Sequence, residues 1–176
     1  MLSVLICTLP ERKVMLERLK PLFRHPLVEI IVDPATHLSI GAKRNRLLDL
    51  ARGKYLLYAD DDDVIDRIAF EMILEALKQD PDTVGIRGKI YELGREKQWY
   101  ISIKYDRWFE KNNIYYRFAN HLSPVRSSIA KQVRFPDKNF SEDHAYSVAI
   151  RPLLKTEIIV DRDYYYYQPS GRPLKP

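Results

Sequence analysis

The chain has 176 residues, of which 45% are hydrophobic and 30% are charged, and its formal net charge is +5. This length supplies one hydrophobic core, and the composition excludes a disordered chain. No apolar run reaches the roughly 20 residues of a transmembrane helix, which excludes a membrane-spanning protein. The basic excess is modest and evenly spread, so it favours anionic small ligands or peripheral contact with an acidic membrane surface, and no nucleic-acid partner is expected.

The N-terminal segment and the cysteine content predict the compartment. Residues 1–12 have a short apolar run without a basic leader, which predicts a strand rather than a signal peptide. Cys7 is the single cysteine, so we expect no internal disulfide and a reducing, cytoplasmic setting.

In chain order, the first ninety residues alternate predicted strands and helices. Short apolar runs predict buried strands at 2–7, 28–32, 55–59 and 83–91. Apolar residues at helical spacing predict helices at 11–23, 40–51 and about 69–77. Gly53 is predicted to end the second helix, and Asp66 to cap the third. Strands that alternate with helices through short connections run parallel, so the pattern predicts an α/β layer fold.

The second half has a less regular pattern. Apolar alternation predicts a strand at 99–105, while 113–125 mixes aromatic and polar residues without clear periodicity. A short helix is predicted at 142–151, followed by strands at 156–160 and 163–167. We expect one domain whose mixed, mostly parallel central sheet is flanked by helices, with this half covering the site.

Polar residues follow three of the predicted parallel strands. Thr8, Pro10 and Glu11 follow the first strand, Asp33 ends the second, and residues 60–63 are four consecutive aspartates after the third. Ligands of such sheets bind beyond the carboxyl ends of the strands. We therefore expect these side chains along one edge of the sheet.

The four aspartates predict a metal site. Alternate residues of an extended segment face one side, so Asp60 and Asp62 can converge. Their mutual repulsion is relieved by a divalent cation, and Mg²⁺ or Mn²⁺ takes only one or two protein carboxylates beside water and phosphate oxygens. The alternative is a solvated acidic turn in which Asp63 or Asp66 caps the next helix. The preceding buried strand favours the metal–diphosphate site.

A cation begins the apolar stripe of the second helix. Arg44, Leu47, Leu48 and Ala51 share one helical face, and Lys43 and Arg44 lie near the helix N-terminus, where phosphate is favoured. Arg44 reaching solvent, or pairing with an aspartate of the acidic run, is the open alternative.

Four segments, "SVLICTLPER", "EIIVD", "IGAKRNRLLDLARGKYLLYADDDD" and "FSEDHAYSVAI", resemble in sequence and order the blocks of family 2 glycosyltransferases of the GT-A fold. The likeness is strongest over 1–65 and 140–146 and weak over 90–135. The terminal "YYYYQPSGR" is similar to the family's terminal stretch, except that Gln168 and Pro169 depart from its usual arginine. Compact members of this kind resemble phage and large-virus proteins, which would place a viral member in the host cytoplasm.

The resemblance implies roles for the donor-side residues. Thr8, Pro10 and Glu11 would line a nucleoside pocket, and Asp33 would bind the base, most often uracil. A second group would serve the ribose, diphosphate and metal: Asp60 or Asp61 near the ribose, Asp62 with Asp60 on Mn²⁺ or Mg²⁺, and Arg44 orienting the nucleotide or stabilising Asp62. His121 and His144 are candidate further metal ligands, with ordinary structural roles as the alternative.

The resemblance also implies an inverting transfer from a nucleotide-diphosphate sugar, most often a UDP-sugar, to a hydroxyl acceptor. Such a transfer needs one carboxylate to take the hydroxyl proton, and the resemblance assigns this role to Asp143. The alternative is that Ser141, Glu142 and Asp143 only cap a helix. Residues 1–95 would form the nucleotide-sugar half and 96–176 the acceptor and catalytic-base half.

Two other functions compete with this one. A nucleotidyltransferase also needs acidic metal ligands on an α/β sheet, but a Gly-rich loop would be expected after the first strand, and "TLPERK" has no glycine. A non-catalytic carbohydrate-binding relative is the second alternative, which the presence of Asp60, Asp62 and Asp143 disfavours.

Overall fold

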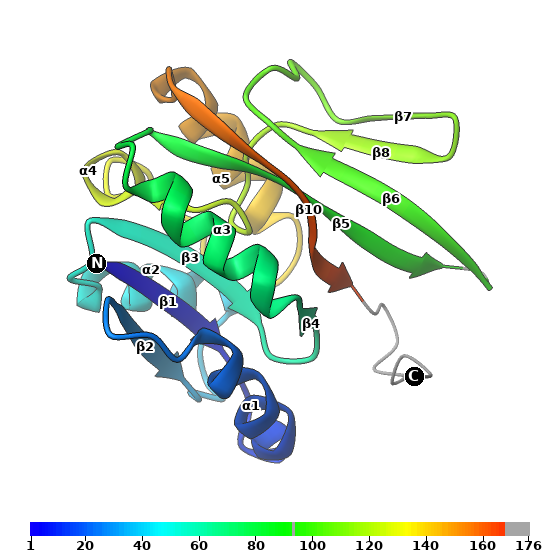
Figure 1. Cartoon of the computed structure of the whole chain (residues 1–176). Helices are drawn as coiled ribbons and strands as arrows, with labels where there is room; N and C mark the ends of the chain where they lie inside the picture. The colour runs from blue at the N-terminus through cyan, green and yellow to red at the C-terminus, as the bar shows by residue number, and fades with distance from the viewer. Residues whose placement is uncertain (93, 168–176) are drawn as a thin grey trace.

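A computed structural model describes residues 1–92 and 94–167, and a single mixed sheet runs through this part of the chain (Figure 1). The neighbouring strands in the sheet are β2-β1-β3-β9-β5-β6-β8-β7, and β10 pairs with both β5 and β4. The strand bounds are β1 Leu2–Cys7, β2 Val28–Asp33, β3 Tyr55–Asp60, β4 Val64–Ile65, β5 Thr83–Glu92, β6 Arg95–Ile101, β7 Phe109–Lys111, β8 Ile114–Arg117, β9 Val125–Arg126 and β10 Glu157–Tyr167.

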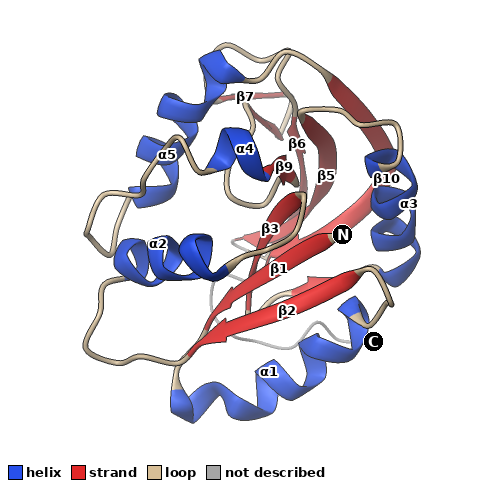
Figure 2. Ribbon diagram, turned by 90° about the vertical axis from the view of Figure 1, so that its left-hand side faces the viewer, coloured by secondary structure: helices blue, strands red, loops and turns tan. Residues whose placement is uncertain are grey.

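Helices flank both faces of this sheet. In Figure 2, α2, α4 and α5 lie on one side of the sheet and α3 on the other, while α1 lies beside β2. The helix bounds are α1 Lys13–Leu19, α2 Ile40–Leu50, α3 Arg67–Leu77, α4 Ser127–Ala130 and α5 Glu142–Ile150, with 3-10 turns at Pro10–Arg12, Lys20–Phe23 and Arg151–Leu153. The expected mixed α/β sheet flanked by helices is confirmed. Of the helices in the described ranges, none is long and apolar enough to cross a membrane.

The register of the N-terminal strands brings the predicted polar residues to one level. β1 lies between β2 and β3 and is parallel to both, and Cys7 is opposite Asp33 on one side and Asp60 on the other. All six residues of β1 are buried. The three carboxyl ends therefore meet at one edge of the sheet, as the alternation of strands and helices predicted.

Gly53 has a different role from the predicted one. Helix α2 ends at Leu50, its C-cap residue Ala51 is extended, and Gly53 is not in the left-handed region. A Cβ atom at Gly53 would lie 2.5 Å from the backbone nitrogen of Ser3. Glycine is therefore needed because β1 approaches closely, not because it terminates the helix.

Two strand predictions in the second half need correction. The strand predicted at 99–105 is β6 and ends at Ile101, because the chain turns at 102–105, where the amide of Tyr105 donates to the carbonyl of Ser102. The two strands predicted at 156–160 and 163–167 are one strand, β10, with register irregularities between Ile159 and Tyr165. β10 pairs with β5 from Glu157 to Tyr167, and at Tyr165 and Tyr166 it pairs with β4 as well.

Candidate active site

The four aspartates of the acidic run have different surroundings. Asp61 is buried, and its carboxylate accepts hydrogen bonds from the Thr8 hydroxyl at 2.5 Å and from Arg12 Nη1 at 2.8 Å. Asp62 is partly exposed and accepts from the same Arg12 nitrogen at 3.1 Å. One guanidinium therefore holds two neighbouring carboxylates at the end of β3.

The last strand contacts the other two aspartates of the run. The buried Tyr165 hydroxyl donates to Asp63 Oδ2 at 2.6 Å and accepts from the backbone N–H of Asp60 at 3.2 Å. Burial, with the charges of Asp63 and Asp60, raises the pKa of Tyr165 far above its usual range, so the phenol stays neutral and can donate. Asp63 thus has a contact that fixes the loop after β3.

Arg44 is a buried cation between two carboxylates. Its Nη1 lies 2.5 Å from Glu142 Oε1, and its Nη2 lies 3.3 Å from Asp60 Oδ1. Its guanidinium also lies 5.5 Å from the ring centre of Phe135. Burial alone would raise the pKa of Asp60, but the nearby imidazole of His121 and the charge of Arg44 outweigh it and hold that pKa well below its usual range. Of the two alternatives for Arg44, the structure has the ion pair with the acidic run.

His121 lies between the acidic run and helix α5. Its ring is buried, with Nε2 at 3.6 Å from Asp60 Oδ2 and Nδ1 at 3.9 Å from Asp143 Oδ2. Neither nitrogen has a hydrogen-bond partner among the described atoms at ordinary donor–acceptor distance. Two carboxylates that are 83 positions apart in the sequence thus face the same imidazole.

The first turn of α5 does not have the predicted capping pattern. The N-cap residue Ser141 has a φ of +57° and its side chain makes no capping hydrogen bond. Glu142 is buried against Arg44, while Asp143 is partly exposed. The capping alternative is therefore not realised by Ser141, and Asp143 is accessible from the neighbouring cavity.

A cavity of about 330 Å³ brings Asp60, His121 and Asp143 together. Its aromatic wall contains Trp99 from β6 and Tyr115 from β8. A volume of this size accommodates a sugar ring, and the carboxylates are at its polar side.

A second cavity of about 260 Å³ lies over the ends of β1 and α2. Thr8, Arg12 and Lys43 are in its lining, and the Lys43 ammonium donates to the Thr8 carbonyl at 2.6 Å. Pro10 and Glu11 are exposed in the adjoining 3-10 turn and do not line this cavity.

Asp33 is buried at the end of β2. Its Oδ1 accepts from Arg46 Nη2 at 2.7 Å and from the amide of Ala35 at 2.9 Å. Its Oδ2 is buried and has no hydrogen-bond partner among the described atoms. The acid predicted to bind a base therefore has a free acceptor oxygen, although it does not line either of these two cavities.

The donor atoms of the acidic run are compatible with a divalent cation. Burial, together with the charges of Asp60 and Asp61, raises the pKa of Asp62 despite the nearby Arg12. A cation would relieve this repulsion, and Mg²⁺ needs only one or two protein carboxylates beside water and phosphate. Within residues 1–92 and 94–167, no three His, Cys, Asp or Glu residues form a ready ligand cluster. A cation held by Asp62 and Asp60 together with substrate oxygens therefore stays a prediction.

His144 and Cys7 have other environments. The ring of His144 packs edge-on against Trp108 at 4.8 Å between ring centres and lies 6.2 Å from the ring of Phe118. Burial raises the pKa of the Cys7 thiol to about 12, which leaves it a weak nucleophile. The terminal segment with Gln168 and Pro169 lies outside the described residues.

Sequence reasoning missed three residues of the site. Arg12 holds Asp61 and Asp62, Glu142 pairs with Arg44, and Arg117 lines the 330 Å³ cavity. The signal for Arg117 was its position two residues after Tyr115, since alternate strand residues share a face. The partners of Arg12 and Glu142 are 49 and 98 positions away, beyond any local pattern.

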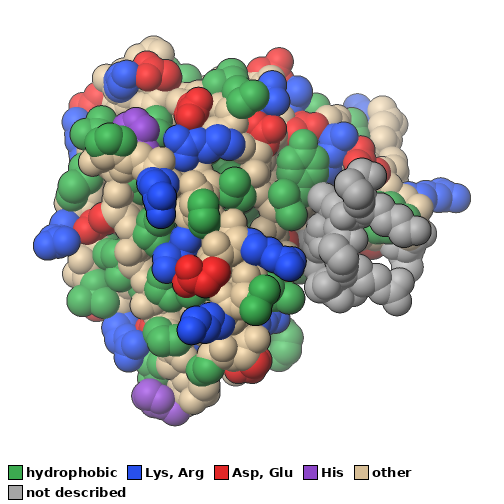
Figure 3. All heavy atoms as spheres, turned by 60° about the horizontal axis from the view of Figure 1, so that its bottom comes forward, with side chains coloured by type: hydrophobic (Ala, Val, Ile, Leu, Met, Phe, Trp, Pro, Cys, Tyr) green, Lys and Arg blue, Asp and Glu red, His purple; other side chains and the backbone are tan. Residues whose placement is uncertain are grey.

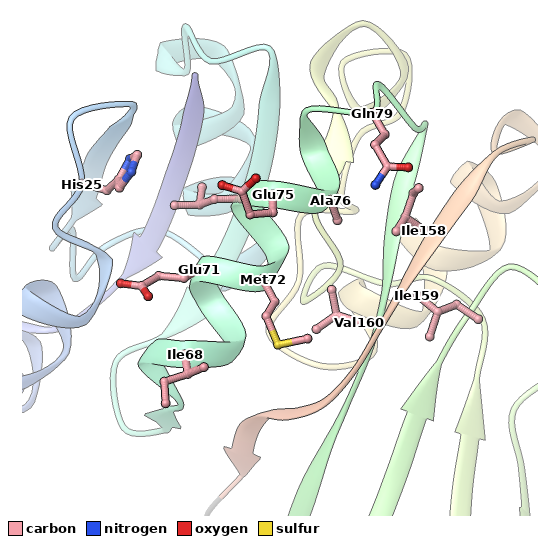
Figure 4. Close-up of a pocket in the computed structure, with 11 residues that line it drawn as sticks. His25, Ile68, Glu71, Met72, Glu75, Ala76, Gln79, Ile158, Ile159 and Val160 are labelled. Carbon is pink, nitrogen blue, oxygen red and sulfur yellow. The ribbon is translucent and has the colours of Figure 1, made fainter.

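A larger cavity of about 600 Å³ is separate from these residues. It lies between α3 and β10, and Ile68, Met72, Ile159 and Val160 are among the side chains that line it (Figure 4). None of the predicted site residues is in its lining.

Seen from the lower side of Figure 1, Lys and Arg side chains are interspersed with hydrophobic and acidic ones, in keeping with the diffuse net charge (Figure 3).

The sequence matches the family model described as Glycosyl transferase family 2 over residues 10–135. No curated protein matches the chain in sequence. The fold is similar to that of S. aureus TarS 1–349 in complex with UDP-GlcNAc, with a TM-score of 0.70, 15% identity, and coverage of 99% of this chain and 59% of that chain. The complex of TarS 1–349 with UDP gives a TM-score of 0.70, 18% identity, and coverage of 95% and 60%.

A more distant likeness is to the bifunctional IspDF from Campylobacter jejuni, with a TM-score of 0.52, 9% identity, and coverage of 92% of this chain and 50% of that one. Likenesses at these identities show the fold alone. The chain spans about three fifths of the length of TarS 1–349.

Proposed function

This chain belongs to glycosyl transferase family 2, and from that membership we propose that it moves a sugar from a nucleotide-diphosphate sugar to a hydroxyl acceptor with inversion at the anomeric carbon. The observation that carries the proposal is the 330 Å³ cavity in which Asp60, at the end of β3, and Asp143, at the start of α5, face one His121. A donor diphosphate on the acidic run and an acceptor in the cavity would then meet between these carboxylates.

The reaction needs one base and one stabilised leaving group. Asp143 takes the proton of the acceptor hydroxyl as its oxygen bonds to the anomeric carbon, and the bond from that carbon to the diphosphate breaks on the opposite face. A nucleoside diphosphate leaves as an anion, so no second carboxylic acid is required, unlike in glycoside hydrolysis. Asp143 suits this role because it is partly exposed to the cavity, whereas Glu142 is buried against Arg44.

Asp62 and Asp60 would hold Mn²⁺ or Mg²⁺, which when bound supplies positive charge for the departing diphosphate. Arg12 would keep Asp61 and Asp62 in place, and Arg44 would keep Asp60 ionised through its charge. Thr8, through its hydrogen bond to Asp61, would fix the side of the nucleoside pocket. We further propose that Asp33 binds the base, because its Oδ2 is an unused acceptor.

A UDP-sugar is the first donor to test, because TarS, whose fold is similar, has structures with UDP-GlcNAc and with UDP. The chain would work as one domain, with residues 1–95 binding the donor and 96–176 supplying the acceptor site and the base. A cytoplasmic location, with peripheral membrane contact through the net charge of +5, remains a prediction that cell fractionation tests.

Thermal unfolding with and without nucleotide tests the donor and the metal together. At 100 times its dissociation constant, UDP with Mn²⁺ should stabilise the protein by about 2.7 kcal/mol, and UDP with a chelator by less. GDP, a UDP-sugar and a GDP-sugar complete the series. No metal-dependent stabilisation by any of these nucleotides would overturn the proposal, and binding without sugar transfer to any acceptor would support the non-catalytic alternative.

A further inference from the structure

The wall of the 330 Å³ cavity is made by one face of β6 and β8. These strands are parallel, with Trp99 opposite Tyr115 and Ile101 opposite Arg117. Alternate strand residues face the same side, and all four of these side chains line the cavity. The wall therefore has two aromatic side chains, one aliphatic side chain and one guanidinium.

Arg117 differs from the other cations of the site. Its guanidinium carbon lies 4.7 Å from the ring centre of Trp108 and 5.7 Å from that of Tyr115. Its side chain makes no hydrogen bond or ion pair with any side chain in the described part of the chain. Arg12 and Arg44, in contrast, each contact two carboxylates.

Stacking leaves the hydrogen-bonding edge of Arg117 available. A guanidinium that lies against rings keeps its N–H groups in the plane, where they match a carboxylate or a phosphate. Burial lowers the pKa of Arg117, and among the neighbouring charges Asp143 opposes this effect most strongly. An anion bound at Arg117 would offset the cost of burying the charge.

A second observation points into the same cavity. His121 is about nine-tenths buried and lines the cavity, and neither ring nitrogen has a hydrogen-bond partner among the described atoms. Buried polar atoms without partners are rare unless a ligand or water completes them. The cavity thus contains an imidazole and a guanidinium that both lack strong partners among the described residues.

We propose that the acceptor is an anionic sugar, whose carboxylate or phosphate binds Arg117 while one of its hydroxyl groups reaches Asp143. The proposal rests on the proposed glycosyltransferase function and names the substrate class of its acceptor site. Trp99 and Tyr115 would pack against the apolar face of the sugar ring, and His121 would bind a polar substituent. A neutral sugar would leave the guanidinium unpaired, so the wall discriminates by charge.

The binding of simple sugars measures this discrimination directly. NMR titrations compare glucuronate, glucose 6-phosphate, glucose and inorganic phosphate on the wild type, Arg117→Gln, Arg117→Lys and Arg95→Gln. Arg95 is exposed on β6, so its variant controls for the lost charge on the same strand. The thermal midpoint of each variant checks its fold.

An anionic sugar should bind the wild type about tenfold more tightly than glucose, which is the size of one charge-assisted pair. Arg117→Gln should lose this preference, Arg117→Lys should keep part of it, and Arg95→Gln should keep all of it. Glucuronate and glucose 6-phosphate distinguish a carboxylate from a phosphate ligand. Equal binding of glucose, a preference that survives in Arg117→Gln, or inorganic phosphate binding as tightly as glucose 6-phosphate would each overturn the proposal.

Stabilisation by UDP and Mn²⁺ separates this proposal from the proposed function. Unchanged UDP stabilisation of Arg117→Gln, with the sugar preference lost, supports an acceptor site. Weaker UDP stabilisation of Arg117→Gln would instead place Arg117 on the donor diphosphate and overturn the acceptor assignment. Absence of UDP stabilisation in both proteins would contradict the proposed function, while the sugar titrations would still decide the anion site.

Discussion

The charged side chains at the rim of the sheet, Asp60–Asp63, have partners within the chain, whereas the charged side chain of the cavity wall on β6 and β8 has none among the described residues. At the rim, Arg12 holds Asp61 and Asp62, Arg44 holds Asp60, and Tyr165 holds Asp63. On the wall, Arg117 is stacked on rings and has no carboxylate partner among the described residues. Charges that are paired within the chain keep the site residues in place, whereas a half-buried charge without a partner is available to a ligand.

The largest effect is expected from Asp143, which lines the cavity and has no strong side-chain partner in the described part of the chain. Asp143→Asn should lower the rate of sugar transfer by about 10²–10⁴, because it removes the base and keeps the shape. Transfer is measured as release of the nucleoside diphosphate from the donor that the binding series selects, and UDP binding should be unchanged. The exposed Asp106 supplies the control Asp106→Asn. Full activity of Asp143→Asn would exclude this residue as the base.

The structural role of the paired charges is tested at Arg44. Arg44→Met should lower the free energy of unfolding by about 3–5 kcal/mol, because Glu142 and Asp60 are left as buried or half-buried carboxylates without their cation. Urea denaturation measures this loss. The matched variant Arg18→Met, at an exposed position of α1, should change the free energy by no more than about 0.5 kcal/mol. Equal stabilities of the two variants would contradict a structural role for the buried cation.

A smaller effect is expected where the rim meets the ligand. Asp62→Ala should weaken UDP binding in Mn²⁺ by about tenfold or more, because it removes a proposed metal ligand. Binding without Mn²⁺ should change little. Isothermal titration calorimetry with Mn²⁺ and with a chelator measures both quantities. Equal losses in the two conditions would show that Asp62 contacts the nucleotide and not a metal.

The smallest effect concerns stability without ligand. The pKa of Asp62 is raised in the folded protein by burial and by Asp60 and Asp61. The contribution of the Asp62 carboxyl to the free energy of unfolding is therefore fully present below the pKa that this group has in the unfolded protein. It is lost as the pH rises through the pKa of the group in the folded protein. Asp62→Asn, which resembles the protonated form, should stabilise the protein at pH 7 by about 1 kcal/mol, or roughly 2–4 °C.

This advantage should disappear near pH 3, where the wild-type carboxyl is protonated in both states. Thermal unfolding at the two pH values measures it. A variant that is less stable than the wild type at pH 7 would show that the Arg12 contact outweighs the repulsion.

Sequence patterns predicted the rim better than the wall, for a physical reason. The strands β1, β2 and β3 are short apolar runs whose ends are fixed by the polar residues that follow, so Thr8, Asp33 and Asp60 could be assigned to one edge. The pairing of Arg44 with Glu142 could not be predicted, because the two residues are 98 positions apart. Gly53 is a similar case, since its need for a small residue comes from Ser3 on another strand. The helical and strand periodicity of a sequence does not indicate which distant residues will be in contact.

The wall was harder to predict because β6 and β8 are short and partly exposed, so their apolar alternation is weak. Residues 113–125 gave no clear period, although Tyr115 and Arg117 share a face of β8. The function of this region depends on which side chains remain unpaired, and pairing is settled only when all strands are in place.

The contact between Tyr165 and Asp63 has a consequence for the order of assembly. It joins residues 102 positions apart, so the loop after β3 receives this hydroxyl only after residue 165 has been synthesised. Contacts of such sequence separation form late, because the entropy of closing the intervening chain must be overcome first. A nascent chain that stops before Tyr165 should therefore keep the contacts of Thr8 and Arg12 with Asp61 and Asp62 but lack the one that fixes Asp63, and full competence to bind nucleotide should arise during the final steps of folding.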